Sequence, residues 1–176
     1  LGRKKIFSNI FSFSAGEYEG RQSAFTEKTI NEVVRASYEM GEVKTGALIV
    51  IEQNVALGEY VRTGISIDGL VTSQLLINIF EHNTPLHDGA VIIRGNRIVS
   101  ATCYLPLTDS MDIGKELGTR HRAAVGISEV SDSLTIIVSE ETGAVSLAKD
   151  GRLYKHLQKE ELVEKLQQLK VDDTGN

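Results

Sequence analysis

The chain has 176 residues, of which 41% are hydrophobic and 24% charged, and its formal net charge is -5 at pH 7. This length and composition are typical of one soluble globular domain with a substantial core. The negative charge argues against a general nucleic-acid-binding surface. The single cysteine, Cys103, excludes an internal disulfide and a multi-cysteine metal site. Because Cys103 lies in an apolar run, we predict a buried thiol there.

Residues 1–22 are predicted to form an arm or linker, because no hydrophobic period is sustained there. Arg3, Lys4 and Lys5 form a basic patch beside Ile6 and Phe7. This patch fits a linker that follows a removed membrane segment on its cytoplasmic side, and it fits an amphipathic arm equally well. No run in the printed chain reaches the roughly 18 apolar residues that a membrane-spanning helix needs.

Hydrophobic periodicity predicts alternating helices and strands behind this arm. Helices are expected at 26–40 with Gly41 as a stop, at 56–62 as one or two turns, from a cap at Thr72 or Ser73, at 119–128 and at 159–169. Strands are expected at 46–51, at 65–67 before an Asp68-Gly69 turn, at 90–94, 97–105, 134–139 and 144–149, and near Leu153. Hairpins at 95–96, 140–143 and 150–151 exclude a purely parallel sheet. The predicted fold class is α/β, with a central twisted mixed β-sheet flanked by helices on both faces.

The most unusual stretch is the basic helix start within residues 118–126. Thr119 is a good N-cap, because its hydroxyl can accept an orphan backbone N–H. Arg120, Arg122 and a protonated His121 are each unfavourable there by roughly 0.3–1 kcal/mol, since a helix N-terminus is partially positive. A bound anion such as a phosphate would explain the cluster. The alternative is a solvated basic turn whose charges are paired by Glu116 or Glu129.

Two loops place further polar groups at strand ends. In His87-Asp88-Gly89-Ala90, Asp88 is an acceptor for a metal or a hydroxyl, Gly89 permits a close backbone approach, and Ala90 occupies little space. The stretch from Ser139 to Gly143 is a tight turn with two adjacent carboxylates, Glu140 and Glu141. Taken alone, each loop is better explained as an exposed acidic turn than as a site.

The combination of these loops favours nucleotide chemistry. Arginines suit phosphates and carboxylates suit a divalent cation. Tyr104, before Leu105 and Pro106 at a strand end, offers a ring that could stack on a base, or it is an ordinary edge aromatic. The chain has no Gly-rich Walker loop and no GxGxxG fingerprint, which excludes a P-loop NTPase and a Rossmann enzyme.

A competing metal pattern comes from His82 and His87-Asp88, which are similar to the metal ligands of helical phosphohydrolases. That site needs its residues on helices of a nearly all-α domain. Here Pro85 and Gly89 interrupt helical structure and strands follow at once, so we reject this assignment.

Three motifs, in this order and spacing, resemble the diadenylate cyclase domain: Asp88-Gly89-Ala90, Gly118-Thr119-Arg120-His121-Arg122-Ala123-Ala124 and Ser139-Glu140-Glu141-Thr142-Gly143. The resemblance covers about 25–157 and is strongest to the membrane-anchored bacterial branch. It implies a cyclase domain at 23–158 and a C-terminal helix and tail at 159–176. It also implies that the full-length protein lies in the cell membrane with this domain facing the cytoplasm.

The resemblance implies an enzyme that condenses two ATP molecules into cyclic di-AMP and two pyrophosphates, at the interface of a face-to-face homodimer. Asp88 would position or deprotonate the attacking 3′-hydroxyl, directly or through a metal, while Gly89 and Ala90 line the ribose. The helix start would hold the triphosphate and stabilise charge at the α-phosphorus through Gly118, Thr119, Arg120, His121 and Arg122. Ser139, Glu140 and Glu141 would contact phosphate, and Tyr104 and Leu105 would bracket the adenine.

The implied cofactor is Mg²⁺ or Mn²⁺, held by Asp88, His87 and Glu141. Family resemblance also suggests a membrane-tethered regulator and a phosphoglucosamine mutase as partners, and no nucleic acid. Two other classes of function stay open at this point. One is a nucleotide sensor of the same fold without catalysis, and the other is an interaction module whose acidic and basic loops pair across an interface.

Overall fold

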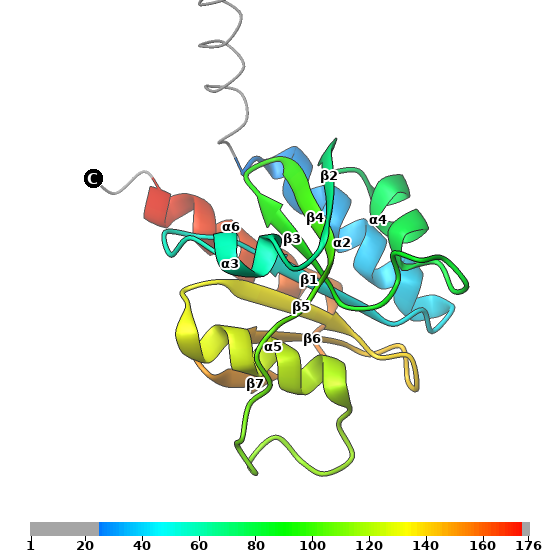
Figure 1. Ribbon diagram of the computed structural model, residues 1–176, viewed down its shortest axis with the longest axis vertical. Helices are drawn as coiled ribbons and strands as arrows, with labels where there is room; N and C mark the ends of the chain where they lie inside the picture. Colours follow the sequence, from blue (N-terminus) through cyan, green and yellow to red (C-terminus); the bar gives the residue numbers. More distant parts are fainter. Residues whose placement is uncertain (1–24, 174–176) are drawn as a thin grey trace, which may run out of the picture.

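The computed structural model describes residues 25–173 and contains one seven-stranded mixed sheet (Figure 1). The predicted arm at 1–22 lies outside the described residues. The strand order is β2-β4-β3-β1-β5-β6-β7. The pair β1–β3 is parallel and the other neighbours are antiparallel. The strands are β1 (Ala47–Ile51), β2 (Ile65–Leu70), β3 (Ala90–Arg94), β4 (Arg97–Cys103), β5 (Leu134–Val138), β6 (Val145–Lys149) and β7 (Arg152–Tyr154).

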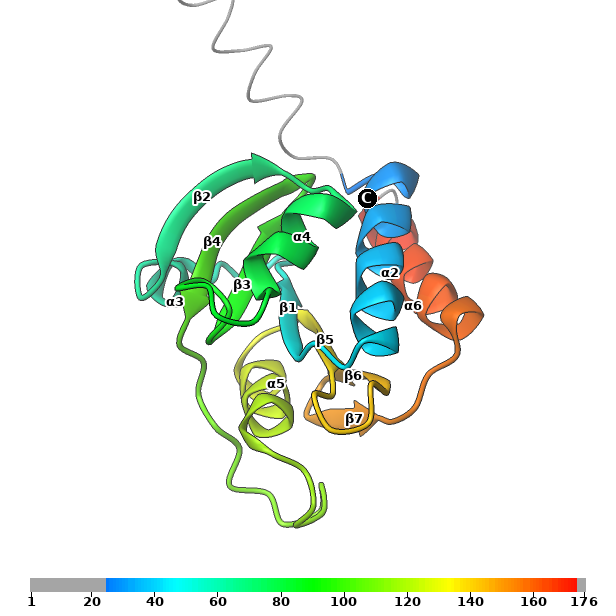
Figure 2. The ribbon, with the colours of Figure 1, turned by 90° about the vertical axis from the view of Figure 1, so that its right-hand side faces the viewer.

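Helices cover both faces of this sheet, which confirms the predicted fold class. Helices α2 (Glu27–Glu42), α4 (Ser73–Phe80) and α6 (Lys159–Asp173) pack on one face, and α5 (Thr119–Val130) and the short α3 (Gly58–Val61) pack on the other (Figure 2). The central strand β1 is buried throughout, and its side chains alternate between the two cores. Each fully buried aliphatic side chain contributes about 1.5–3 kcal/mol, so the sheet is held from both sides.

Side-chain caps set the starts of two helices. Thr26 Oγ1 accepts the N–H of Thr29 at the start of α2, and Thr72 Oγ1 accepts the N–H of Leu75 at the start of α4, as predicted for Thr72. Helix α5 differs, because its N-cap is Gly118 and no side chain caps it. The prediction of Thr119 as N-cap was therefore wrong by one residue. The consequence is that the first N–H groups of α5 have no side-chain acceptor.

Two predicted stops were also wrong. Helix α2 continues through Gly41 to Glu42. A side chain at Gly41 would meet the carbonyl oxygen of Gly143 at 2.5 Å, so this glycine lets α2 approach the turn that follows β5. Strand β2 likewise continues through Asp68-Gly69 to Leu70. The pair forms a bulge, since the register with β4 shifts there and Asp68 has a φ of 47°.

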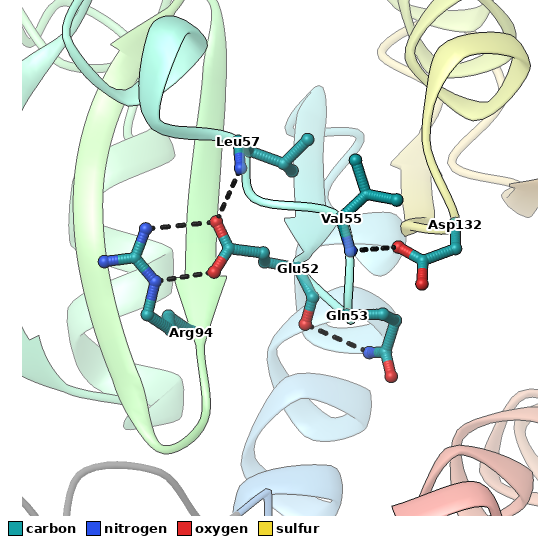
Figure 3. A network of polar contacts seen from close by, with 6 residues as sticks. All are labelled: Glu52, Gln53, Val55, Leu57, Arg94 and Asp132. Carbon is teal, nitrogen blue, oxygen red and sulfur yellow. Dashed lines mark hydrogen bonds and ion pairs between the residues drawn. The ribbon is translucent and has the colours of Figure 1, made fainter.

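A polar network closes the edge of the sheet where β1 and β3 end (Figure 3). Arg94 donates two hydrogen bonds to Glu52, at 2.6 and 3.0 Å, and the backbone N–H of Leu57 donates a third at 2.9 Å. Asp132 accepts the N–H groups of Asn54 and Val55. This network fixes the connection from β1 to α3 and leaves the opposite edge of the sheet free for a pocket.

Candidate functional site

A pocket of about 1220 Å³ lies at the opposite edge of the sheet. It is lined from the starts of β1 and β3, the ends of β4, β5 and β7, and the N-terminus of α5. These chain ends meet because β1 and β3 run in parallel while β4 and β5 run against them. The pocket therefore joins the three sequence motifs, which lie far apart in the chain.

The loop before β3 contributes His87, Asp88 and Gly89 to the pocket. Gly89 has a φ of +78°, and a side chain there would meet the backbone of Thr102 and Cys103 at 2.9 Å, so glycine is required twice over. His87 Nδ1 lies 2.6 Å from the carbonyl oxygen of Thr84, and its Nε2 lies 3.4 Å from Asp88 Oδ1. The Asp88 side chain is 86% exposed and is therefore accessible to a group outside its own chain.

The end of β4 presents Tyr104 and Leu105 at the same pocket. The Tyr104 ring is exposed, while its backbone N–H donates to Thr63 Oγ1 at 2.9 Å. Thr63 in turn donates to the carbonyl oxygen of Tyr60 at 2.6 Å. Just before this segment, Thr102 has a φ of 54° at an irregularity in the β3–β4 register, which redirects the chain. An aromatic ring is thus displayed on a fixed backbone. Cys103 is buried, as predicted.

Arg120 is the cation that α5 directs into the pocket. Its Nη1 lies 3.3 Å from Glu140 Oε2, and its side chain is 23% exposed. The guanidinium lies over Gly46, where an added Cβ would come within 2.6 Å of Nη1. The alternative pairing with Glu116 or Glu129 is wrong: Glu116 pairs with Lys155, and Glu129 accepts a short hydrogen bond from the Thr108 hydroxyl.

The turn after β5 places Ser139, Glu140 and Glu141 in the pocket. Ser139 Oγ accepts the backbone N–H groups of Glu141 and Thr142, both at 3.2 Å. Gly143 completes the turn with a φ of +75°. The two glutamates are exposed, so they remain free to face a cation or to release Arg120.

His121 is buried beside this charged rim. Burial lowers its pKa most, and the positive charges of Lys155 and Arg120 lower it further. Glu141 opposes the shift, and His156 adds to it. The imidazole is therefore mainly neutral at pH 7, and its ring can donate one hydrogen bond and accept another.

Two predicted residues do not line the pocket. Ala90 is fully buried within β3 and belongs to the core under α5. Arg122 follows one residue after His121, and its backbone oxygen accepts the N–H of Thr108 at 3.1 Å. Gly118 and Thr119 do line the pocket, at the uncapped helix start.

Sequence reasoning missed several lining residues, including two groups of neighbouring residues. The first is the α2–β1 connection, from Val43 to Gly46, and the second is the pair Lys155 and His156 after β7. Neither carried a motif. Only the strand order, which places the start of β1 and the end of β7 at this edge, brings them to the pocket.

The carboxylates that line the pocket are the kind of ligand that a divalent cation prefers. Mg²⁺ is usually held by one or two carboxylates together with substrate phosphates, and Asp88 and Glu141 both line the pocket. Between residues 25 and 173, no cluster of three or more His, Cys, Asp or Glu side chains is arranged to hold a metal without further ligands. The described residues would thus supply only some of the ligands of such a cation, and phosphate oxygens of the substrate would supply others.

The sequence and the fold of this chain are both similar to those of known proteins. A protein-family model described as DisA bacterial checkpoint controller nucleotide-binding, abbreviated DAC, matches residues 34–153. The chain is 54% identical over 167 residues to cyclic di-AMP synthase CdaA of Bacillus subtilis, covering 95% of this chain and 58% of the relative. It is 49% identical over 162 residues to a diadenylate cyclase of Listeria monocytogenes, covering 92% and 56%.

Solved structures agree. A double mutant of DacA from Staphylococcus aureus superposes with a TM-score of 0.79 at 51% identity, covering 81% of this chain and 95% of that one. A hypothetical membrane spanning protein from Bacillus cereus gives 0.72 at 42% identity, covering 88% and 76%. The chain therefore belongs to the DAC family, as its motifs indicated. It spans somewhat more than half the length of the curated relatives named above. Within residues 25–173, no helix is long and apolar enough to cross a membrane.

Proposed function

We propose that this chain is the catalytic domain of a diadenylate cyclase, which condenses two ATP molecules into cyclic di-AMP and two pyrophosphates. The observation that carries the proposal is the single pocket that joins Asp88, Tyr104, Arg120 and Ser139. An aromatic ring for a base, a carboxylate for a hydroxyl, and an arginine at an uncapped helix N-terminus for phosphates are the groups that this reaction needs.

Each residue acts on a different part of ATP. Tyr104 and Leu105 bracket the adenine, and Gly89 lines the ribose. Arg120 and the free N–H groups at the start of α5 hold the triphosphate and stabilise the charge that develops at the α-phosphorus. Arg120 exchanges Glu140 for phosphate as ATP enters, because their ion pair is partly exposed and weak.

Asp88 prepares the attacking group. Its exposed carboxylate accepts a hydrogen bond from a ribose 3′-hydroxyl and takes up the proton as the oxygen attacks the α-phosphorus of the other nucleotide. The new P–O bond forms as the bond to pyrophosphate breaks, in line. Asp88, Glu141 and His87 would hold Mg²⁺ or Mn²⁺, which would neutralise negative charge on the phosphates when bound.

A second copy of the chain is part of this proposal. Each ATP supplies a hydroxyl and receives an attack, so two identical sites must face each other across a two-fold axis. The largely exposed Asp88 side chain allows such a meeting. We also propose that the full-length protein lies in the cell membrane with this domain in the cytoplasm, as the family resemblance implies.

Incubation with ATP and Mn²⁺ or Mg²⁺, followed by mass spectrometry, tests the proposal. We expect cyclic di-AMP from the wild type. Asp88→Asn should form none while it still binds ATP, because the amide cannot take up the proton. ATP binding without product in the wild type would instead indicate a nucleotide sensor of the same fold. Normal product formation by Asp88→Asn would refute the role of Asp88.

A further inference from the structure

The strand order arranges the pocket residues along one line at the sheet edge. The strands follow one another as β4-β3-β1-β5-β6-β7, and the ends of five of them at the pocket each have a lining residue next to them. Along this order the residues are Tyr104 at β4, Asp88 at β3, Gly46 at β1, Ser139 at β5 and Lys155 at β7. Neighbouring strands lie about 4.8 Å apart, so the end of β7 is about 10 Å beyond the end of β5. A nucleotide with its base at Tyr104 and its phosphates at Ser139 and Arg120 points its outer phosphates toward Lys155.

The backbone that carries Lys155 is fixed. The N–H of His156 donates to Ser146 Oγ at 3.4 Å, and the N–H of Leu157 donates to the carbonyl oxygen of Val145 at 2.8 Å. The hydroxyl of Tyr38 on α2 donates to the carbonyl oxygen of Leu157 at 2.7 Å. Lys155 and His156 therefore stand at the pocket rim on a segment attached to both β6 and α2.

The ammonium of Lys155 has only a weak partner. Its Nζ lies 3.9 Å from Glu116 Oε1, and both side chains are substantially exposed, at 39% and 72%. An exposed ion pair of this kind holds its charges loosely, so a phosphate can replace Glu116. The positive charge of Lys155 also reaches His121, whose pKa it lowers, which places this charge on the pocket side of β7.

We propose that Lys155, assisted by His156, is the outer phosphate subsite, which binds the β- and γ-phosphates that leave as pyrophosphate. The inference rests on the proposed function and deepens it. Arg120 and the start of α5 hold the inner phosphate, and Lys155 holds the group that departs. Lys155 is a binding residue here and makes no contact with the attacking hydroxyl.

Nucleotides with one, two and three phosphates test this subsite. We would titrate the protein with 3′-deoxyadenosine mono-, di- and triphosphate in Mg²⁺, because these lack the attacking hydroxyl and are not turned over. Lys155→Gln should weaken binding of the triphosphate about tenfold, which is the effect of losing one charge-assisted contact, and leave the affinity for the monophosphate unchanged. Lys155→Arg should restore the triphosphate affinity. Lys159→Gln on α6, which does not line the pocket, is the matched control.

The outcomes separate the subsite from the reaction. Equal losses for all three nucleotides in Lys155→Gln, or no loss, would overturn the subsite whether or not the wild type makes cyclic di-AMP. A loss of affinity in Lys155→Gln that is selective for the triphosphate, together with a wild type that forms no product, would uphold the subsite and overturn the reaction. A selective loss together with product formation supports both. Melting temperatures of the variants check that each one is folded.

Discussion

Gly46 is the residue whose replacement tests the position of Arg120 most directly. A Cβ at Gly46 would lie 2.6 Å from Arg120 Nη1 and 2.7 Å from its Cζ, whereas ordinary contacts begin near 3.4 Å. In Gly46→Ala the guanidinium must therefore move by about 1 Å. The fold itself should tolerate the alanine, because Gly46 is not among the described glycines with positive φ and the obstacle is the end of a flexible side chain.

A displacement of about 1 Å in a positioning group costs about a hundredfold in rate. We therefore expect Gly46→Ala to lose about that factor in kcat/KM for cyclic di-AMP formation. Its stability should stay near that of the wild type, since replacing glycine at a compatible position reduces unfolded-state entropy by about 0.4–1 kcal/mol. The assay is product formation over a range of ATP concentrations, with thermal melting of the same samples.

Gly118→Ala is the matched control. Gly118 also lines the pocket, yet a Cβ there meets no atom within 4 Å. This variant should keep its activity within a few-fold, because the added methyl group meets no atom and leaves the backbone N–H groups of α5 in place. Its stability should fall slightly, since alanine is a poorer N-cap residue than glycine. Wild-type kcat/KM in Gly46→Ala, or equal losses in both variants, would refute the claim that the space above Gly46 is reserved for the guanidinium.

Three further results are expected. Glu52→Ala should lose about 1–3 kcal/mol of stability and several degrees of Tm, because Arg94 and the Leu57 N–H lose their acceptor. Nucleotide affinity measured by titration should stay unchanged, because Glu52 lies at the opposite edge of the sheet from the pocket. Burial, Lys155 and Arg120 lower the pKa of His121 in the folded state. The stability that the neutral imidazole contributes is therefore complete above pH 6.5 and is lost as the pH falls through the lowered folded pKa. Urea unfolding should show a smaller free energy of unfolding at pH 5.5 than at pH 7.5, and His121→Gln should reduce this difference. Specific activity should rise with protein concentration, and activity strictly proportional to protein down to nanomolar levels would contradict obligatory pairing.

Local patterns were sufficient to predict most elements of this fold. The buried Ile30, Val33 and Val34 share the inner face of α2, and the short apolar run of β1 is the central strand. The Gly95-Asn96 hairpin lies between β3 and β4 as its turn signal indicated. These signals succeed because each depends on neighbours a few residues away.

The errors came from contacts between distant segments. Gly41 does not stop α2, because its missing side chain serves the approach of Gly143. Asp68-Gly69 does not end β2, because pairing with β4 continues across the bulge. Thr119 is inside α5, where the empty cap at Gly118 leaves N–H groups for an anion. A local signal could not show any of these partners.

The pairing of charges at the pocket also bears on the proposal that this acidic protein binds a polyanion. Arg120 is paired with Glu140 and Lys155 with Glu116, so each cation has a carboxylate partner. Both pairs are partly exposed and therefore weak. Phosphate oxygens carry more charge than a carboxylate and can take its place, and each released glutamate returns to water rather than to an apolar core. In the proposed complex the glutamates would then face the second nucleotide or a cation instead of opposing the first nucleotide. On this reasoning the acidic residues hold the basic pocket ready for exchange, and net charge alone is a poor guide to the ligand.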